Sequence, residues 1–149
     1  MKRPGTYVLF LRFPEGVETE VGALGTIVLE AGDYCYVGSA MGGLDQRLSR
    51  HLSHEKNVRW HIDYLTTICD EMHALEHEGD SIAECDLARI VESIGNAPAV
   101  MNFGCSDCGC QTHLFKIDPK RTKRALMDIG MTNFEFQKRI SNINTVNLT

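Results

Sequence analysis

Apolar runs in the first forty residues predict a small sheet of antiparallel strands. Residues 7–13, 26–30 and 34–38 are rich in β-branched and aromatic side chains, and turn residues such as Pro14-Glu15-Gly16 and Gly32-Asp33 bound them. Tight turns join antiparallel neighbours, whereas parallel strands need a long crossover connection. The pattern therefore predicts a three-stranded antiparallel meander.

The rest of the chain is predicted to contain helices and two further strands. Apolar residues recur at helical spacing, and proline or glycine marks the ends of these segments. The predicted helices cover 44–54, 60–65, 81–94 and 118–130, and the predicted strands cover 72–75 and 113–117. These elements indicate an α+β fold with a small antiparallel sheet, in one domain over residues 1–130. Residues 131–149 are expected to form a tail or a packed extension.

Length and composition place the chain among single-domain cytoplasmic proteins. Its 149 residues suffice for one domain with a real core. No apolar run is long enough to span a bilayer, so no membrane partner is expected. The first five residues combine charge with proline, unlike a signal peptide. The six cysteines are therefore interpreted as reduced thiols or metal ligands.

Charge is unevenly distributed along the chain. The net charge of −5 argues against strong general affinity for nucleic acid. Residues 47–61 are nevertheless rich in arginine, lysine and histidine, whereas residues 70–92 are rich in aspartate and glutamate. A basic face beside an acidic one suits an anionic substrate with a cation-binding carboxylate nearby. Two ordinary solvated faces would give the same pattern.

Two tyrosines beside glycines are candidates for chemistry. Gly5-Thr6-Tyr7 opens the first predicted strand, and Tyr36-Val37-Gly38 closes the third. Glycine allows a phosphate or another backbone to approach closely. A phenol acts as a base only if its pKa falls well below 10, which requires a nearby cation. Cross-strand aromatic packing is the alternative explanation for both tyrosines.

The predicted helix at 44–54 supplies the cations. Arg47, Arg50 and His51 share one face, and the forked guanidinium of arginine matches phosphate oxygens. Glu84 is a carboxylate at the border of a buried helix face. Glu84 is therefore either a site carboxylate or the glutamate of a helix capping box, because Ser81 and Glu84 also fit that pattern.

Cys105, Cys108, Cys110 and His113 are the residue types of a tetrahedral zinc site. Their spacing is tight for four ligands of one ion. The alternative is a loop of reduced thiols without metal. Asp107 and His113 then become polar groups at a pocket edge.

These motifs, taken in their order along the chain, resemble those of the GIY-YIG nuclease superfamily. They resemble more closely an archaeal and bacterial branch that is sometimes fused to endonuclease III-type proteins. The similarity covers residues 4–117. It rests on Gly5-Thr6-Tyr7, Tyr36-Val37-Gly38-Ser39-Ala40, Arg47, Arg50-His51, Trp60 to Leu65, Glu84-Cys85 and the segment from Ser106 to Phe115.

The resemblance implies a small central antiparallel sheet flanked by helices. It also implies a metal-dependent phosphodiesterase acting on nucleic acid, with DNA favoured over RNA and a repair protein as a further partner. Tyr7 would activate water with support from Tyr36, Arg47 would contact the phosphate, and Glu84 would hold Mg²⁺ or Mn²⁺. The alternative is a catalytically silent module that binds nucleic acid or protein on the same scaffold and is held together by zinc. The residues expected to contact substrate are Gly38, Ser39, Arg50, His51, His61 and Asp107.

Overall fold

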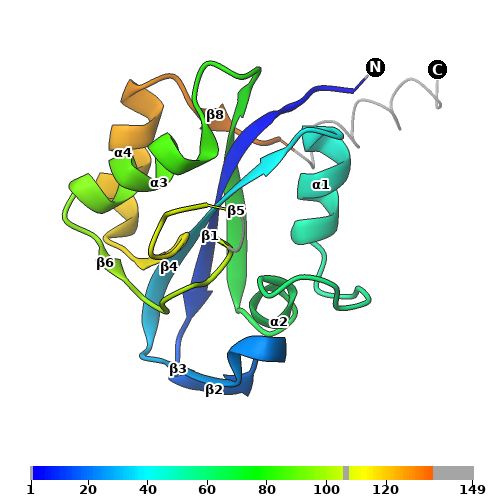
Figure 1. Ribbon diagram of the computed structural model, residues 1–149, viewed down its shortest axis with the longest axis vertical. Coiled ribbons are helices and arrows are strands. Elements are labelled where there is room, and N and C mark those ends of the chain that lie inside the picture. Colours follow the sequence, from blue (N-terminus) through cyan, green and yellow to red (C-terminus); the bar gives the residue numbers. More distant parts are fainter. Residues whose placement is uncertain (1, 106–107, 136–149) are drawn as a thin grey trace.

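A six-stranded antiparallel sheet forms the centre of the protein (Figure 1). The computed structural model describes residues 2–105 and 108–135, and within them the strand order is β6-β7-β4-β1-β5-β8. The strands are β1 (Gly5–Phe13), β4 (Gly32–Ala40), β5 (Glu71–Glu78), β6 (Ala97–Pro98), β7 (Leu114–Lys116) and β8 (Thr132–Asn133). Every pairing in this sheet is antiparallel, which confirms the predicted α+β class.

Helices cover both faces of the sheet. Figure 1 shows α1 (Leu44–His51) and α2 (Asp63–Thr66) on one side of the central strands, and α3 (Glu84–Ser93) and α4 (Pro119–Asp128) on the other. The start of α4 follows the expected rule, because the Asp118 side chain accepts a hydrogen bond from the backbone N–H of Arg121. Of the helices in the described part of the chain, none has the length and apolar character needed to cross a membrane.

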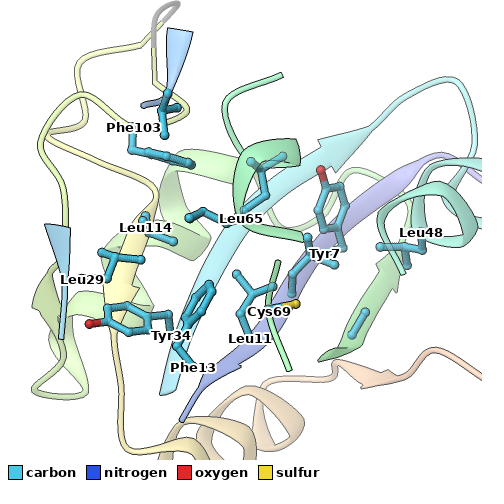
Figure 2. Close-up of a cluster of buried hydrophobic side chains, with 14 of the residues drawn as sticks. Tyr7, Leu11, Phe13, Leu29, Tyr34, Leu48, Leu65, Cys69, Phe103 and Leu114 are labelled. Atoms are coloured by element: carbon cyan, nitrogen blue, oxygen red, sulfur yellow. The ribbon is translucent and has the colours of Figure 1, made fainter. Parts of the chain in front are cut away.

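Strand alternation divides the core into two apolar clusters. Tyr7, Leu9 and Leu11 of β1 face α1 and α2, where they join the cluster drawn in Figure 2. Val8 and Phe10 of the same strand belong to the cluster beneath α3 and α4. In Figure 2 the Tyr7 hydroxyl points away from Leu11, so the ring is part of the core while its oxygen lies at the margin.

The predicted meander is wrong in its middle strand. β3 (Thr26–Leu29) leaves the main sheet and pairs with β2 (Val17–Glu20) in a separate two-stranded sheet, while β1 pairs directly with β4. The segment between β1 and β3 is long enough to hold β2, and β3 pairs with β2 and not with β1. Val28 is exposed on the resulting hairpin.

Three element boundaries also differ from the sequence prediction. The helix expected from Ser81 begins at Glu84, and the helix expected to reach His54 ends at His51. The sheet continues beyond residue 130, because β8 pairs with β5 and both Met131 and Phe134 are buried. Residues 131–134 thus pack against the sheet, while residues 136–149 of the predicted tail or extension lie outside the described part of the chain.

A buried ion pair joins α1 to α2. The Asp63 side chain is fully buried and lies 2.7 Å from the Arg50 guanidinium. Its carboxylate also accepts hydrogen bonds from the backbone N–H groups of Arg59 and Trp60. Burial alone would raise the pKa of Asp63, but Arg50 and these N–H groups outweigh it, so the pKa lies below its ordinary value.

We expect Asp63→Ala to lower the free energy of unfolding by about 3–5 kcal/mol at neutral pH, because the change leaves Arg50 and two N–H groups without their acceptor. Urea denaturation is the measurement. Since the folded-state pKa is depressed, the contribution of Asp63 is complete above about pH 4 and is lost as the pH falls further.

Asp86→Ala is the matched control for this prediction. Asp86 and Arg89 also lie 2.7 Å apart, but both side chains are about two-thirds exposed. Exposed pairs contribute about 0–1 kcal/mol. An equal loss in the two variants would show that Asp63 does not stabilise the α1–α2 connection.

Candidate active site

A pocket of about 360 Å³ opens where β4 loses its neighbour on one side. β7 pairs with β4 only over Tyr34–Tyr36, so Gly38 and Ser39 have a ladder partner on the β1 side alone within the described residues. Side chains from both faces of the sheet reach this uncovered edge. The residues that line the pocket are Tyr7, Tyr36, Gly38, Ser39, Arg47, His51, Arg59, Trp60, His61, Ile62, Glu84 and Gly104.

The structure brings the four predicted catalytic side chains together in this pocket. Tyr7 and Tyr36 come from β1 and β4, Arg47 from α1, and Glu84 from the first turn of α3. Because α1 and α3 lie on opposite faces of the sheet, only a pocket that wraps around a strand edge can collect all four (Figure 1).

Gly38 makes room for the Tyr7 ring. The two residues are direct partners across β1 and β4. A Cβ atom added at Gly38 would overlap the Tyr7 hydroxyl and would lie only 2.9 Å from its Cε1 atom. The absence of a side chain at this position therefore allows the phenol to lie against the β4 backbone.

Tyr7 and His51 form a buried polar pair. The Tyr7 hydroxyl lies 2.9 Å from His51 Nε2, and the two residues are 2% and 1% exposed. Burial lowers the pKa of His51 to about 3, with a further contribution from Lys56, so the imidazole is neutral. Burial and the proximity of Tyr36 raise the pKa of Tyr7, which Arg47 only partly offsets. The lowered phenol pKa required by the sequence argument is not found in the free protein.

Arg47 and Arg50 contact the same tryptophan but have different hydrogen-bond partners. Arg47 donates a hydrogen bond to the Ser39 carbonyl and lies 4.5 Å from the centre of the Trp60 ring. Arg50 lies 4.4 Å from the same ring, but its guanidinium is held by Asp63. Arg47 is thus a pocket residue, whereas Arg50 supports the Trp60 segment from outside the lining.

Glu84 is held on both of its carboxylate oxygens. Ser39 Oγ donates to Oε1 at 2.6 Å, and His113 Nδ1 lies 2.9 Å from Oε2. Burial alone would raise the pKa of Glu84, but the contacts with His113 and Ser39 lower it below its ordinary value. The capping-box interpretation is wrong, because the N-cap is Ala83 and no side chain caps this helix.

A cluster of three thiols and one imidazole lies next to Glu84. The ligand atoms of Cys85, Cys108, Cys110 and His113 all lie within 4.8 Å of one another, an arrangement that could hold a metal ion. The thiols of the described cysteines are all free. Cys105, the fourth ligand expected from the sequence, is not in this group, and Cys85 takes its place.

A comparison with family models matches residues 6–135 to a family described as domain of unknown function DUF123. The chain belongs to this family. Searches of curated proteins and of solved structures each found no match. The matched range of the DUF123 domain contains every residue of the pocket and of the Cys–His cluster.

The remaining predicted site residues of the DUF123 domain have different positions. Gly38, Ser39, His51 and His61 line the pocket. Asp107 lies outside the described residues.

Sequence reasoning missed several parts of the site. It did not assign pocket roles to Arg59, Trp60, Ile62 or Gly104. Arg59 could have been found from the basic segment that contains it. Cys85 could have been found from its place beside Glu84, but it is remote in sequence from the other three ligands.

We expect Gly38→Ala to displace the Tyr7 ring, because the added methyl group occupies the position of the phenol. The cost in the free energy of unfolding should be about 1–3 kcal/mol, which is typical of overpacking a core. Urea denaturation measures the stability, and the near-ultraviolet circular dichroism of the tyrosines reports the displacement.

Gly42→Ala is the control, because a Cβ atom at Gly42 meets nothing within 4 Å. Its effect should stay within about 0.5 kcal/mol. Equal effects of the two variants would rule out the tight contact between Gly38 and Tyr7.

Proposed function

We propose that this DUF123 domain is a phosphodiesterase that hydrolyses nucleic acid, with DNA as the favoured substrate. The observation that carries the proposal is the convergence of the Tyr7–His51 pair, Arg47 and Glu84 in one pocket. Together these groups supply a proton-transfer pair, a phosphate-binding cation and a metal-binding carboxylate, which are the components that phosphodiester hydrolysis requires. The resemblance to the GIY-YIG superfamily supports the same assignment.

The pocket is suited to a phosphate with a base attached. Arg47 and Arg59 provide the positive charge on its wall. Trp60 is 38% exposed at the same wall, and the accessible part of its indole is an apolar contact surface for a nucleobase. The basic lining also explains how a chain with net charge −5 would bind a polyanion, since the favourable field is local to the pocket.

Tyr7 and His51 would carry the proton-transfer chemistry. A water oxygen attacks the phosphorus atom and the bond to the leaving oxygen breaks. The proton released by the water passes to the Tyr7 oxygen as the Tyr7 proton passes to His51 Nε2, which lies 2.9 Å away. The imidazole is neutral in the free protein and has a lone pair to accept the proton, and the negative charge of a bound phosphate would favour the imidazolium that forms. Arg47 balances the negative charge that accumulates on the phosphate oxygens.

Glu84 fits a weak site for Mg²⁺ or Mn²⁺. It is the acidic side chain among the described residues of the pocket lining, and each of its oxygens keeps a lone pair after accepting its contact from Ser39 or His113. One carboxylate completed by waters and substrate phosphate is typical of magnesium. When bound, the ion would polarise the phosphate and stabilise the leaving oxygen.

A cleavage screen with labelled oligonucleotides tests the proposal. Single-stranded, duplex, branched and damaged DNA, with matched RNA, are incubated with the protein in Mg²⁺, Mn²⁺ or EDTA. We expect metal-dependent cleavage that falls by about 10²–10⁴-fold in Tyr7→Phe, because the proton-transfer group is lost. Arg47→Ala and Glu84→Gln should each lose at least about 10²-fold through poorer charge stabilisation.

Two variants serve as controls for this screen. Tyr34→Phe removes another buried phenol, one that bonds the Glu30 carbonyl outside the pocket, and Arg124→Ala removes an exposed cation on α4. Both should keep full activity. Binding without cleavage under every condition would reject the phosphodiesterase and favour the silent binding module, as would full activity in Glu84→Gln.

A further inference from the structure

The Cys–His cluster has the donor set and the spacing of a closed metal site. Three sulfur atoms and one imidazole nitrogen lie within 4.8 Å of one another. Zinc bound tetrahedrally by thiolates at about 2.3 Å holds its sulfur atoms about 3.8 Å apart, so small side-chain adjustments would bring all four donors onto one ion. Four protein ligands leave no open position, which is the pattern of structural zinc.

The four donors come from three separate segments of the fold. Cys85 lies in the first turn of α3, Cys108 and Cys110 lie in the loop that follows β6, and His113 immediately precedes β7. In the described structure none of these cysteines forms a disulfide, although the three sulfur atoms are close together. A single ion would therefore fasten the loop to both the helix and the sheet.

His113 gives a second, independent indication of a ligand. It is fully buried, and its two ring nitrogens face different partners. Nε2 lies 3.6 Å from Cys108 Sγ, on the side of the cluster, while Nδ1 lies 2.9 Å from Glu84 Oε2. A metal-binding histidine usually presents one nitrogen to the ion and donates the other N–H to a carboxylate, which fixes the tautomer and the ring orientation. The placement of the two ring nitrogens beside Cys108 and Glu84 matches this pattern.

We propose that Cys85, Cys108, Cys110 and His113 form a structural zinc site, and that His113 connects this site to the Glu84 carboxylate in the pocket. Zinc would then position Glu84 in two ways. Its ligand Cys85 is the next residue in the chain and fixes the backbone, and its ligand His113 lies beside Oε2 of the Glu84 carboxylate. The ion does not touch the substrate. The zinc site stands independently, whereas its consequence for catalysis rests on the phosphodiesterase assignment.

Zinc content and cobalt substitution test the ligand set without any substrate. Untagged full-length protein, expressed with zinc and purified without chelator, should contain about one zinc per chain by elemental analysis. Replacement by Co²⁺ should give the visible bands of tetrahedral thiolate-bound cobalt. Cys85→Ser and Cys110→Ser should lose the metal, while Cys105→Ser should keep it. Protein with no zinc and no cobalt bands, or equal loss in Cys105→Ser and Cys85→Ser, would overturn the assignment.

The connection to Glu84 is tested by zinc affinity, measured by competition with a chromogenic chelator. Glu84→Gln should weaken zinc binding by about 10–100-fold, because the carboxylate that orients His113 is lost. Ser39→Ala removes the contact on the other oxygen of Glu84 and should leave the affinity unchanged. Unchanged affinity in Glu84→Gln would refute the connection. Circular dichroism confirms that each variant is folded, and an inactive protein with normal zinc binding would reject only the phosphodiesterase.

Discussion

The register between β1 and β4 is the constraint on which the rest of the site depends. It sets Tyr7 opposite Gly38 and Thr6 opposite Ser39. A shift by one residue would turn every side chain of the strand to the other face, because successive residues of a strand point in opposite directions. The Tyr7 phenol would then leave His51, and Ser39 would leave Glu84. The apolar clusters on the two faces hold this register, so the core and the pocket are specified by the same pairing.

Side chains from the two faces of the sheet meet at Glu84. Tyr7, His51 and Arg47 belong to the side covered by α1, while Glu84 and His113 belong to the side covered by α3. Ser39 lies between them, with its hydroxyl on Glu84 and its carbonyl on Arg47. A short stretch of β4 thus ties the proposed phosphate-binding arginine to the proposed metal-binding carboxylate through one residue.

Local patterns predicted the element types well and long-range partners poorly. The strands around Tyr7 and Tyr36 and the helix with Arg47 follow from apolar spacing, whereas the expectation that they converge comes from the order of the motifs and the family resemblance. The separate pairing of β3 with β2 could not be predicted, because alternation of apolar and polar residues identifies a strand but not the strand with which it pairs. Ser81 fits a cap in sequence, but the Glu84 carboxylate contacts Ser39 and His113 instead. Sequence proximity indicates Cys105 as the fourth ligand, whereas the fold brings Cys85 of α3 to the cysteine loop.

The placement of Trp60 gives the protein a built-in optical reporter. It is the one tryptophan in the sequence, and it stands at the pocket wall with the guanidinium groups of Arg47 and Arg50 within 4.5 Å of its ring centre. Indole emission responds to adjacent charge and to stacked bases. Because no second indole contributes a background, the intrinsic fluorescence of the unlabelled chain reads the occupancy of this one wall.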